Sequence, residues 1–107
     1  MSKTLKKLFG LSPRINYTRL IQEGAMVLDV RTPAEFEKGH IAGAINIPIE
    51  QLRANMNQLV NKHRVIIACC TDGSKSWYAK NLLDANGYRS VYNAGDWRKL
   101  QKRIQLH

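Results

Sequence analysis

Short apolar runs alternate with helix-forming stretches along this chain. Strands are predicted at four apolar runs: residues 27–30, 44–47, 65–69 and 90–92. Helical spacing or helix-start signals predict helices around them: residues 17–23, 33–38, 49–59, 76–86 and 97 onward. The five successive apolar residues at 65–69 are typical of a buried parallel strand. Strands that alternate with helices predict an α/β fold of three layers, with helices on both faces of a central parallel sheet.

The helix at 33–38 has a specific start signal. Thr32 can cap the helix with its side chain, and Pro33 suits the first helical position because it has no backbone N–H to satisfy. Glu35 can reach back to the cap. Gly39 follows closely, so we expect a brief helix.

Length and cysteine content limit the class of protein. The 107 residues fit one domain, predicted at 15–107 after a basic N-terminal arm at 1–14. The two cysteines are adjacent, at 69 and 70, which gives no disulfide framework of the secreted kind. The first residues lack the apolar run of a signal peptide, and no stretch approaches the ~18–20 apolar residues that span a bilayer. We therefore expect a cytoplasmic protein with no membrane partner.

The chain is strongly basic, with a net charge of +9 and a pI near 10.0. Lysines and arginines gather toward both ends of the chain: Lys3, Lys6, Lys7, Arg14, Arg19, Arg98, Lys99, Lys102 and Arg103. Such clusters can neutralise phosphates, but no nucleic-acid motif accompanies them. We therefore expect solvated basic surfaces that attract small anions, and no nucleic-acid partner.

The segment after the apolar run at 65–69 has the features of an anion-binding loop. Cys70 is predicted at the start of a turn of about six residues that leads into the next helix. Gly73 permits a positive φ, so backbone N–H groups can converge, and the helix N-terminus and Lys75 add positive charge. These features favour a thiolate and would hold a persulfide. The predicted substrate-binding residues follow Cys70 directly: Thr71, Asp72, Gly73, Ser74, Lys75 and Ser76.

An inert role for the cysteines has to be weighed against this hypothesis. Both could be small buried hydrophobic residues at the end of a strand. This packing role fits Cys69 better than Cys70, because Cys69 is the last residue of the predicted strand and would point away from the loop. Asp72 is a like charge that opposes a thiolate unless it faces solvent or caps the helix. From the residues alone, both a reactive and a packing role for Cys70 stay open.

A longer motif precedes the loop. The residues that define it lie within positions 28–48 and read Asp29-x-Arg31, Glu35-Phe36, Gly39-His40-Ile41-x-Gly43-Ala44 and Asn46-x-Pro48. This segment closely resembles the N-terminal signature of rhodanese-homology domains. Downstream, Cys70-x-x-Gly73-x-Lys75-Ser76 resembles the active loop of that family. The resemblance covers roughly residues 15–100 and implies a five-stranded rhodanese-like sheet in a small single-domain sulfurtransferase.

The resemblance implies covalent sulfur transfer through Cys70. The thiol would take sulfane sulfur from a small sulfur-containing anion such as thiosulfate, or from a protein persulfide, and pass it to a thiol or to cyanide. No cofactor is implied, and the size of the chain implies a monomer. Two alternatives stay open. One is a non-catalytic interaction module of rhodanese fold, and the other is a thiol redox protein of arsenate-reductase type that uses Cys69 and Cys70.

The loop also departs from related patterns. The phosphatase branch of the family has a cysteine, five residues and then an arginine. Counted from Cys70 that position is Ser76, and counted from Cys69 it is Lys75, so neither supplies the bidentate guanidinium that phosphate recognition favours. Lys75 stands where sulfurtransferases frequently have arginine. Near the C-terminus, Ala94 replaces a glycine of the family pattern.

Four residues outside the loop are predicted to support the site. Asp29 and Arg31 are expected to form a charge-assisted pair that orients loops, rather than to act as acid and base. Glu35 is assigned to the helix cap, and His40 to a structural hydrogen bond in a turn. The three histidines and the adjacent cysteines have no zinc-type spacing, so no metal is expected.

Overall fold

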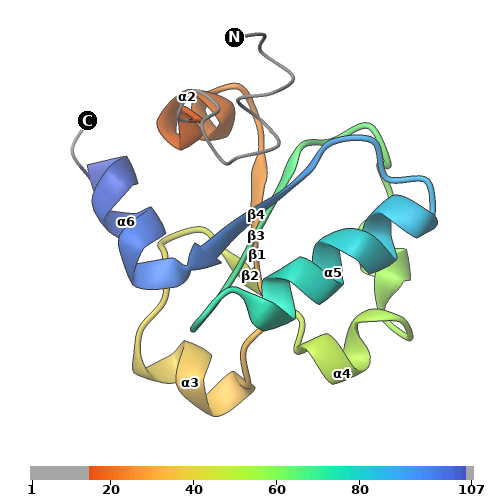
Figure 1. Ribbon diagram of the computed structural model, residues 1–107, viewed down its shortest axis with the longest axis horizontal. Helices are drawn as coiled ribbons and strands as arrows, with labels where there is room; N and C mark the ends of the chain where they lie inside the picture. Colours follow the sequence, from red (N-terminus) through yellow and green to blue (C-terminus); the bar gives the residue numbers. More distant parts are fainter. Residues whose placement is uncertain (1–14, 106–107) are drawn as a thin grey trace, which may run out of the picture.

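The computed structural model describes residues 15–105 and contains a parallel sheet between two layers of helices (Figure 1). The strands are β1 (Met26–Asp29), β2 (Ile45–Asn46), β3 (Ile66–Cys70) and β4 (Val91–Asp96). The helices are α2 (Tyr17–Gln22), α3 (Pro33–Lys38), α4 (Ile49–Leu52), α5 (Ser74–Ala85) and α6 (Trp97–Gln105), with a 3-10 turn η1 (Met56–Gln58). The predicted α/β fold is confirmed. The predicted basic arm at 1–14 lies outside the described residues.

The sheet has the order β2-β1-β3-β4, and each neighbouring pair is parallel. The prediction of five strands is wrong for residues 15–105, which form four strands. The fifth strand was implied by the resemblance alone, since the pattern of apolar residues predicts four strands.

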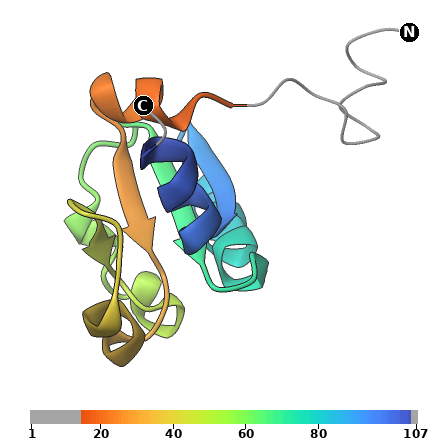
Figure 2. The same ribbon diagram turned by 90° about the vertical axis from the view of Figure 1, so that its left-hand side faces the viewer.

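Two apolar clusters fill the space on either side of the sheet. One joins β1 and β3 to α4 and α5 through residues such as Leu28, Leu52 and Leu83. The other joins the opposite face to α2 and α6 through residues such as Ile67 and Leu100. Seen from the side, α6 packs across the sheet, while α3 lies beside the carboxyl ends of the strands (Figure 2). Catalytic side chains in such sheets lie at these carboxyl ends.

The short helix α3 has the predicted start. The Thr32 side chain accepts a hydrogen bond from the Glu35 backbone N–H, and the Glu35 carboxylate accepts one from the Thr32 N–H. Pro33 is the first helical residue and Gly39 the C-cap, as the sequence predicts. The capping box therefore fixes where the chain turns away after β1.

Several boundaries differ from the sequence prediction, and the strand predicted at 90–92 extends over Val91–Asp96. The strand β3 includes Cys70, and α5 begins at Ser74 instead of Ser76. The stretch at 49–59 is not one helix but α4 followed by the turn η1. The hydroxyl of Tyr88 lies 2.6 Å from the Leu59 carbonyl oxygen and 3.2 Å from that of Met56. The Tyr88 hydroxyl therefore satisfies the Leu59 carbonyl at the end of η1, which has no helical partner.

The end of β4 contains a bulge. Ala68 pairs with Asn93, but Cys69 pairs with Gly95, so Ala94 is an extra residue in β4. Gly95 has a φ of +73°, a conformation that other residues rarely adopt. The strand continues to Asp96, which lies beside Cys70 in the register. A bulge re-aims the residues that follow it, and here it brings the end of β4 against the Cys70 loop.

Candidate active site

Cys70 is the last residue of β3 and is fully buried. Its sulfur accepts hydrogen bonds from two backbone N–H groups, that of Gly73 at 2.9 Å and that of Ser76 at 3.4 Å. The hydroxyl oxygen of Ser76 lies 3.2 Å from the same sulfur. N–H groups that converge on one atom form an anion-binding cradle, so this geometry suits negative charge on Sγ.

The loop that forms this cradle is tighter than the sequence suggested. Only Thr71, Asp72 and Gly73 separate β3 from α5, because α5 begins at Ser74. Gly73 is the N-cap residue in the left-handed conformation, with a φ of +95°. The first turn of a twelve-residue helix is thereby directed at the Cys70 sulfur, which adds the positive end of the helix dipole.

Asp72, the acid within the loop, is exposed and hydrogen-bonded to Ser74. Its Oδ1 accepts hydrogen bonds from the Ser74 N–H at 2.9 Å and from the Ser74 hydroxyl at 2.7 Å. These bonds, that of the backbone N–H first, lower the pKa of the Asp72 carboxyl, with a smaller contribution from the charge of Lys75. The exposed carboxylate therefore stabilises the start of α5 and does not oppose charge on Cys70 directly.

A polar network continues from Ser76 to a residue that the sequence did not single out. The Ser76 hydroxyl donates to Oδ1 of Asn93 at 2.6 Å, and the same oxygen accepts from the Gly95 N–H at 3.0 Å. Nδ2 of Asn93 donates to the Gly73 carbonyl at 3.4 Å. Asn93 thus joins the bulged end of β4 to the loop. No local signal predicts this, since the contact depends on the bulge at Ala94.

Cys69 lies on the opposite face of the sheet from Cys70. It belongs to the cluster with Ile67 and Leu100, whereas Cys70 belongs to the cluster with Ala79 and Leu83. Burial, and next the charge of Asp29, raise the pKa of the Cys69 thiol far above its ordinary value. The prediction that Cys69 faces away from the loop is correct, although β3 extends one residue beyond it.

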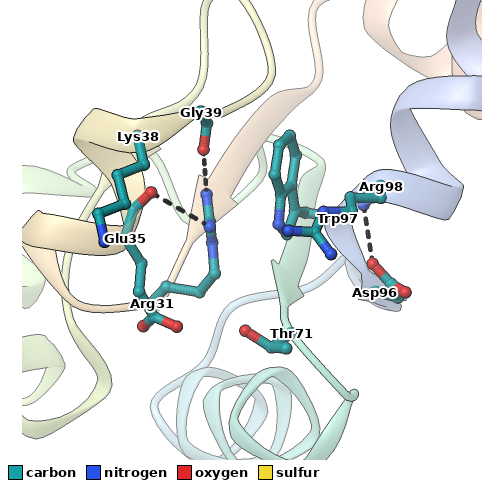
Figure 3. A pocket seen from close by; sticks show the side chains of 8 residues that line it. All are labelled: Arg31, Glu35, Lys38, Gly39, Thr71, Asp96, Trp97 and Arg98. Atoms are coloured by element: carbon teal, nitrogen blue, oxygen red, sulfur yellow. Dashed lines mark hydrogen bonds between the residues drawn. The ribbon is translucent and has the colours of Figure 1, made fainter.

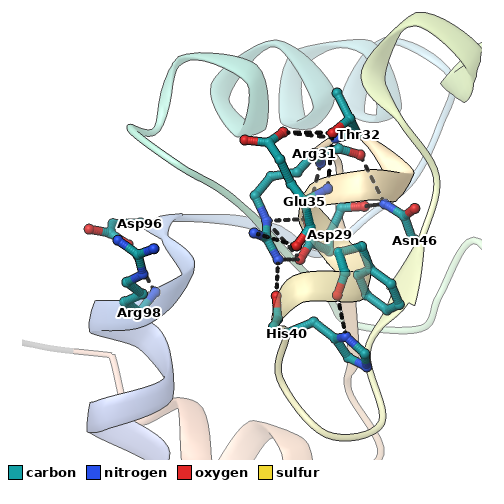
Figure 4. Close-up of polar contacts among 10 residues, drawn as sticks. Asp29, Arg31, Thr32, Glu35, His40, Asn46, Asp96 and Arg98 are labelled. Atoms are coloured by element: carbon teal, nitrogen blue, oxygen red, sulfur yellow. Dashed lines mark hydrogen bonds and ion pairs between the residues drawn. The ribbon is translucent and has the colours of Figure 1, made fainter.

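Asp29 and Arg31 form the predicted ion pair at the end of β1 (Figure 4). The Arg31 Nη2 lies 2.7 Å from Asp29 Oδ2, and its Nε lies 3.0 and 3.1 Å from the two carboxylate oxygens. Arg31 also donates to the carbonyl oxygens of Gly39 and Glu35, and its guanidinium stacks 4.5 Å from the Trp97 ring centroid. Burial alone would lower the pKa of Arg31, but the hydrogen bonds and charge of Asp29 outweigh it and raise that pKa.

The remaining predicted support residues lie around this pair. Hydrogen bonds from Thr32, its backbone N–H first, lower the pKa of Glu35, and the charge of Lys75 contributes. The His40 ring stacks on the Phe36 ring with 3.7 Å between the ring centroids, and its Nδ1 lies 2.6 Å from the Phe36 carbonyl oxygen. Both contacts are local, so they give His40 a structural role. Asn46 donates to the carbonyl oxygens of Asp29 and Arg31, a tie between β1 and β2 that the sequence did not predict.

A cavity of about 320 Å³ opens beside the loop. Figure 3 shows Arg31 and Glu35 on one side of it, Trp97 and Arg98 on the other, and Thr71 between them. Lys38, Gly39 and Asp96 complete the lining. Thr71 is the only one of the predicted loop residues in this lining. Among residues 15–105, no three His, Cys, Asp or Glu side chains gather as metal ligands would.

Replacing Gly73 with alanine tests whether the left-handed cap holds the cradle together. We expect a loss of about 1–2 kcal/mol in the free energy of unfolding, since the φ of +95° disfavours any Cβ. Urea unfolding measures this loss. Gly24→Ala is the matched control, because Gly24 also has a positive φ of +107° with no atom near the added Cβ. Only Gly73→Ala should also change the alkylation rate of Cys70; equal rates in both variants would contradict the assignment.

Comparisons with known proteins identify the family of this chain. A family model described as a rhodanese-like domain matches residues 14–102. Thiosulfate sulfurtransferase PspE of Escherichia coli (strain K12) is 36% identical over 69 residues, which are 64% of this chain and 66% of that protein. Uncharacterized protein YqhL of Bacillus subtilis (strain 168) is 37% identical over 82 residues, 76% of this chain and 64% of that protein. The chain therefore spans slightly less than two thirds of the length of these relatives.

Solved structures share the fold. A rhodanese from E. coli, determined with anions, is 33% identical and has a TM-score of 0.66, with 70% of this chain and 89% of that chain covered. A human single-domain sulfurtransferase is 26% identical and has a TM-score of 0.69, with coverages of 80% and 89%. No helix within residues 15–105 has the length and apolar character needed to cross a membrane.

Proposed function

This chain belongs to the rhodanese-like domain family, and from that premise we propose that it is a sulfurtransferase whose Cys70 carries sulfur as a persulfide. The observation that supports the proposal most is the convergence of the Gly73 and Ser76 N–H groups on the Cys70 sulfur. A cradle of N–H donors at a helix N-terminus stabilises both a thiolate and the terminal sulfur of a persulfide anion. Several of its relatives are also named sulfurtransferases.

The proposed reaction has two displacements. The Cys70 thiolate attacks the sulfane sulfur of the donor, and the donor's sulfur–sulfur bond breaks with its electron pair leaving on sulfite when the donor is thiosulfate. A nucleophilic acceptor then attacks the outer sulfur of the persulfide. The sulfur–sulfur bond breaks again, and its electron pair returns to Cys70 as thiolate. No external oxidant or reductant enters this balance.

The burial of Cys70 means that a sulfur donor cannot reach its sulfur in the conformation described here. Cys70 is completely inaccessible to solvent, whereas Thr71 and Asp72 just after it are exposed. A donor therefore reaches Sγ only when the short loop moves outward. The loop is held by the hydrogen bonds from the Gly73 and Ser76 N–H groups to Sγ and by the hydrogen bond from Asn93 Nδ2 to the Gly73 carbonyl.

The direct test is sulfur uptake by the native chain. We expect incubation with thiosulfate, or with a protein persulfide, to increase the intact mass by one sulfur atom. Added cyanide should remove this sulfur as thiocyanate. A chain that gains no sulfur from either donor would contradict the proposal and favour the interaction-module alternative. The exposed side chains of Trp77 and Tyr78, which follow the loop on α5, would then be the first surface to examine.

Ser76→Ala separates the side-chain contribution to the cradle from that of the backbone. The variant keeps the Ser76 N–H but loses the hydroxyl 3.2 Å from the sulfur. The hydroxyl has one proton, which it can give either to Asn93 Oδ1 or to an ionised Cys70 sulfur. Since a hydrogen bond to a charged group contributes about 1.5–3 kcal/mol, we expect sulfur uptake to slow roughly tenfold if the sulfur receives that proton. Ser90→Ala, which changes the residue just before β4, is the control and should react at the native rate. An unchanged rate in Ser76→Ala would show that the backbone donors suffice.

A further inference from the structure

The Ser76 hydroxyl has three neighbours that can accept a hydrogen bond, but only one proton to donate. Its oxygen lies 2.6 Å from Asn93 Oδ1, 3.2 Å from the Gly73 carbonyl oxygen and 3.2 Å from the Cys70 sulfur. A hydroxyl donates one hydrogen bond and accepts up to two. Ser76 is fully buried, so the choice among these neighbours decides whether it donates to the Cys70 sulfur or accepts from it.

The side-chain amide of Asn93 is held in one orientation by the backbone. Its Oδ1 lies 3.0 Å from the Gly95 N–H, a group that only donates, and its Nδ2 lies 3.4 Å from the Gly73 carbonyl, a group that only accepts. A flipped amide would bring two donors together and two acceptors together. Oδ1 therefore faces Ser76, and at 2.6 Å it accepts the hydroxyl proton.

The other two neighbours compete weakly for this proton while Cys70 is a neutral thiol. The Gly73 carbonyl already accepts from the Trp77 N–H at 3.0 Å and from Asn93 Nδ2. A thiol sulfur is a weak acceptor, and this one already faces the N–H groups of Gly73 and Ser76. In the resting state the Cys70 S–H group therefore donates to the Ser76 oxygen, and the Ser76 hydroxyl donates to Asn93.

We propose that Asn93 is a positioning residue that holds the Ser76 proton away from Cys70 and so sets the pH at which the Cys70 thiolate forms. The resting arrangement stabilises the thiol, because only the thiol has a proton to give to Ser76. When Cys70 loses that proton to solvent, Ser76 turns its own proton to the sulfur, since a hydrogen bond to a charged acceptor is the stronger one. Asn93 Oδ1 then keeps only the Gly95 N–H.

The two backbone donors of the cradle favour the thiolate in both arrangements, and Asn93 partly opposes them. Asn93 thereby limits the pH range in which Cys70 is a nucleophile. Its role in sulfur transfer rests on the proposed function, because it is the thiolate that attacks the donor. The arrangement of the two protons does not rest on it.

The charged and titratable groups at this end of the sheet come from every element around Cys70. Within residues 15–105 none of them is hydrogen-bonded to the Cys70 sulfur or to the Ser76 hydroxyl. They stay the same when Asn93 is replaced, so they contribute equally to each titration. They include Asp29 and Arg31 at the end of β1, Glu35, Glu37 and Lys38 of α3, Glu50 and Arg53 at α4, Cys69 of β3, Asp72 of the loop, Lys75 and Tyr78 of α5, Asp96 of β4 and Arg98 of α6.

The test is a pH titration of the Cys70 thiolate by its ultraviolet absorption, with Cys70→Ser subtracted. It needs neither loop opening nor a sulfur donor, and Cys69 does not interfere because burial raises the pKa of its thiol. Asn93→Leu removes the acceptor of the Ser76 proton. We expect its titration midpoint to lie about 0.5–1 pH unit below that of the native chain, because one neutral hydrogen bond that favours the thiol is lost.

Asn93→Asp tests the opposite direction and is nearly isosteric, so it remains informative should leucine not fit beside the bulge. It keeps an acceptor oxygen for Ser76 and adds a negative charge, so its midpoint should rise. Asn81→Leu is the matched control, since it removes an asparagine amide of α5 that donates to the Trp77 carbonyl. Its midpoint should equal the native one.

A Ser76→Ala background shows whether Asn93 acts through Ser76. The hydroxyl is absent there, so Asn93→Leu should move the midpoint by less than about 0.2 pH unit. A shift of undiminished size in this background would overturn the inference. So would an Asn93→Leu midpoint that stays at the native value or matches that of Asn81→Leu, or a lower midpoint in Asn93→Asp.

Sulfur uptake from thiosulfate is measured on the native chain by intact mass, which keeps the two proposals apart. A native chain that gains no sulfur contradicts the proposed function, while the titration still decides the role of Asn93. Normal uptake together with a midpoint that does not respond to Asn93→Leu overturns only the inference about Asn93.

Discussion

Replacing Cys70 with serine is expected to abolish sulfur uptake from thiosulfate and from protein persulfides. The two N–H donors of Gly73 and Ser76 would remain, but a serine hydroxyl does not form a persulfide and is not ionised at neutral pH. The measurement is the intact mass after incubation with each donor, together with thiocyanate release by cyanide. Serine is close to cysteine in size, so we expect the unfolding midpoint of Cys70→Ser to stay close to that of the native chain.

Cys69→Ser is the matched control, since it alters the neighbouring cysteine on the other face of the sheet. The variant should still gain one sulfur atom, because the Cys69 thiol is buried and its pKa is raised. Sulfur uptake that survives in Cys70→Ser and disappears in Cys69→Ser would reverse the assignment. A disulfide between Cys69 and Cys70 after mild oxidation would instead favour the redox alternative, which the opposite orientation of the two side chains argues against.

Asp29→Ala is expected to lower the free energy of unfolding by about 3–5 kcal/mol, the largest stability effect predicted for this chain. The side chains of the Asp29–Arg31 pair are only 1% and 5% exposed. Removing the carboxylate leaves a buried guanidinium without its counter-charge, between the Trp97 ring and the carbonyl oxygen of Gly39. Urea unfolding followed by far-UV circular dichroism measures the loss.

The exposed pair Lys80–Asp84 provides a control of the same residue type. Its nitrogen–oxygen distance is 2.6 Å, but the two side chains are 37% and 40% exposed. Asp84→Ala should therefore cost no more than about 1 kcal/mol. If the two aspartate variants lose similar stability, burial does not decide the contribution of Asp29.

Local patterns along the chain determined most of the framework. The capping box of Thr32 and Glu35, the helix end at Gly39 and the buried run before Cys70 each involve residues within a few positions of one another. Such features depend on short-range sterics and hydrogen bonds, so they can be predicted without knowing the fold. The ion pair of Asp29 and Arg31 could be predicted for the same reason, because the two residues are only two positions apart in the sequence.

Contacts across the sheet could not be predicted in this way. Asn93 meets Ser76, and Asp96 meets Cys70, because β4 contains one extra residue at Ala94. A shift of one residue exchanges the two faces of a strand, so no local pattern specifies which side chain reaches the loop. The number of strands is a related case, since the fifth strand was expected from resemblance and residues 15–105 contain four.

Local patterns were enough to predict an α/β chain with a cysteine just before a glycine-containing loop that leads into a helix. The groups that surround that cysteine are set by the way the strands and helices pack together. The start of α5 at Ser74 directs two N–H groups at Sγ, the bulge in β4 brings Asn93 and Asp96 to the loop, and α6 presents Arg98 across a cavity from Arg31. Asn93, Asp96 and Arg98 lie far from Cys70 in the chain, so packing and strand register set their distances from it. The two N–H groups are close to Cys70 in sequence, but the residue at which α5 begins sets their direction.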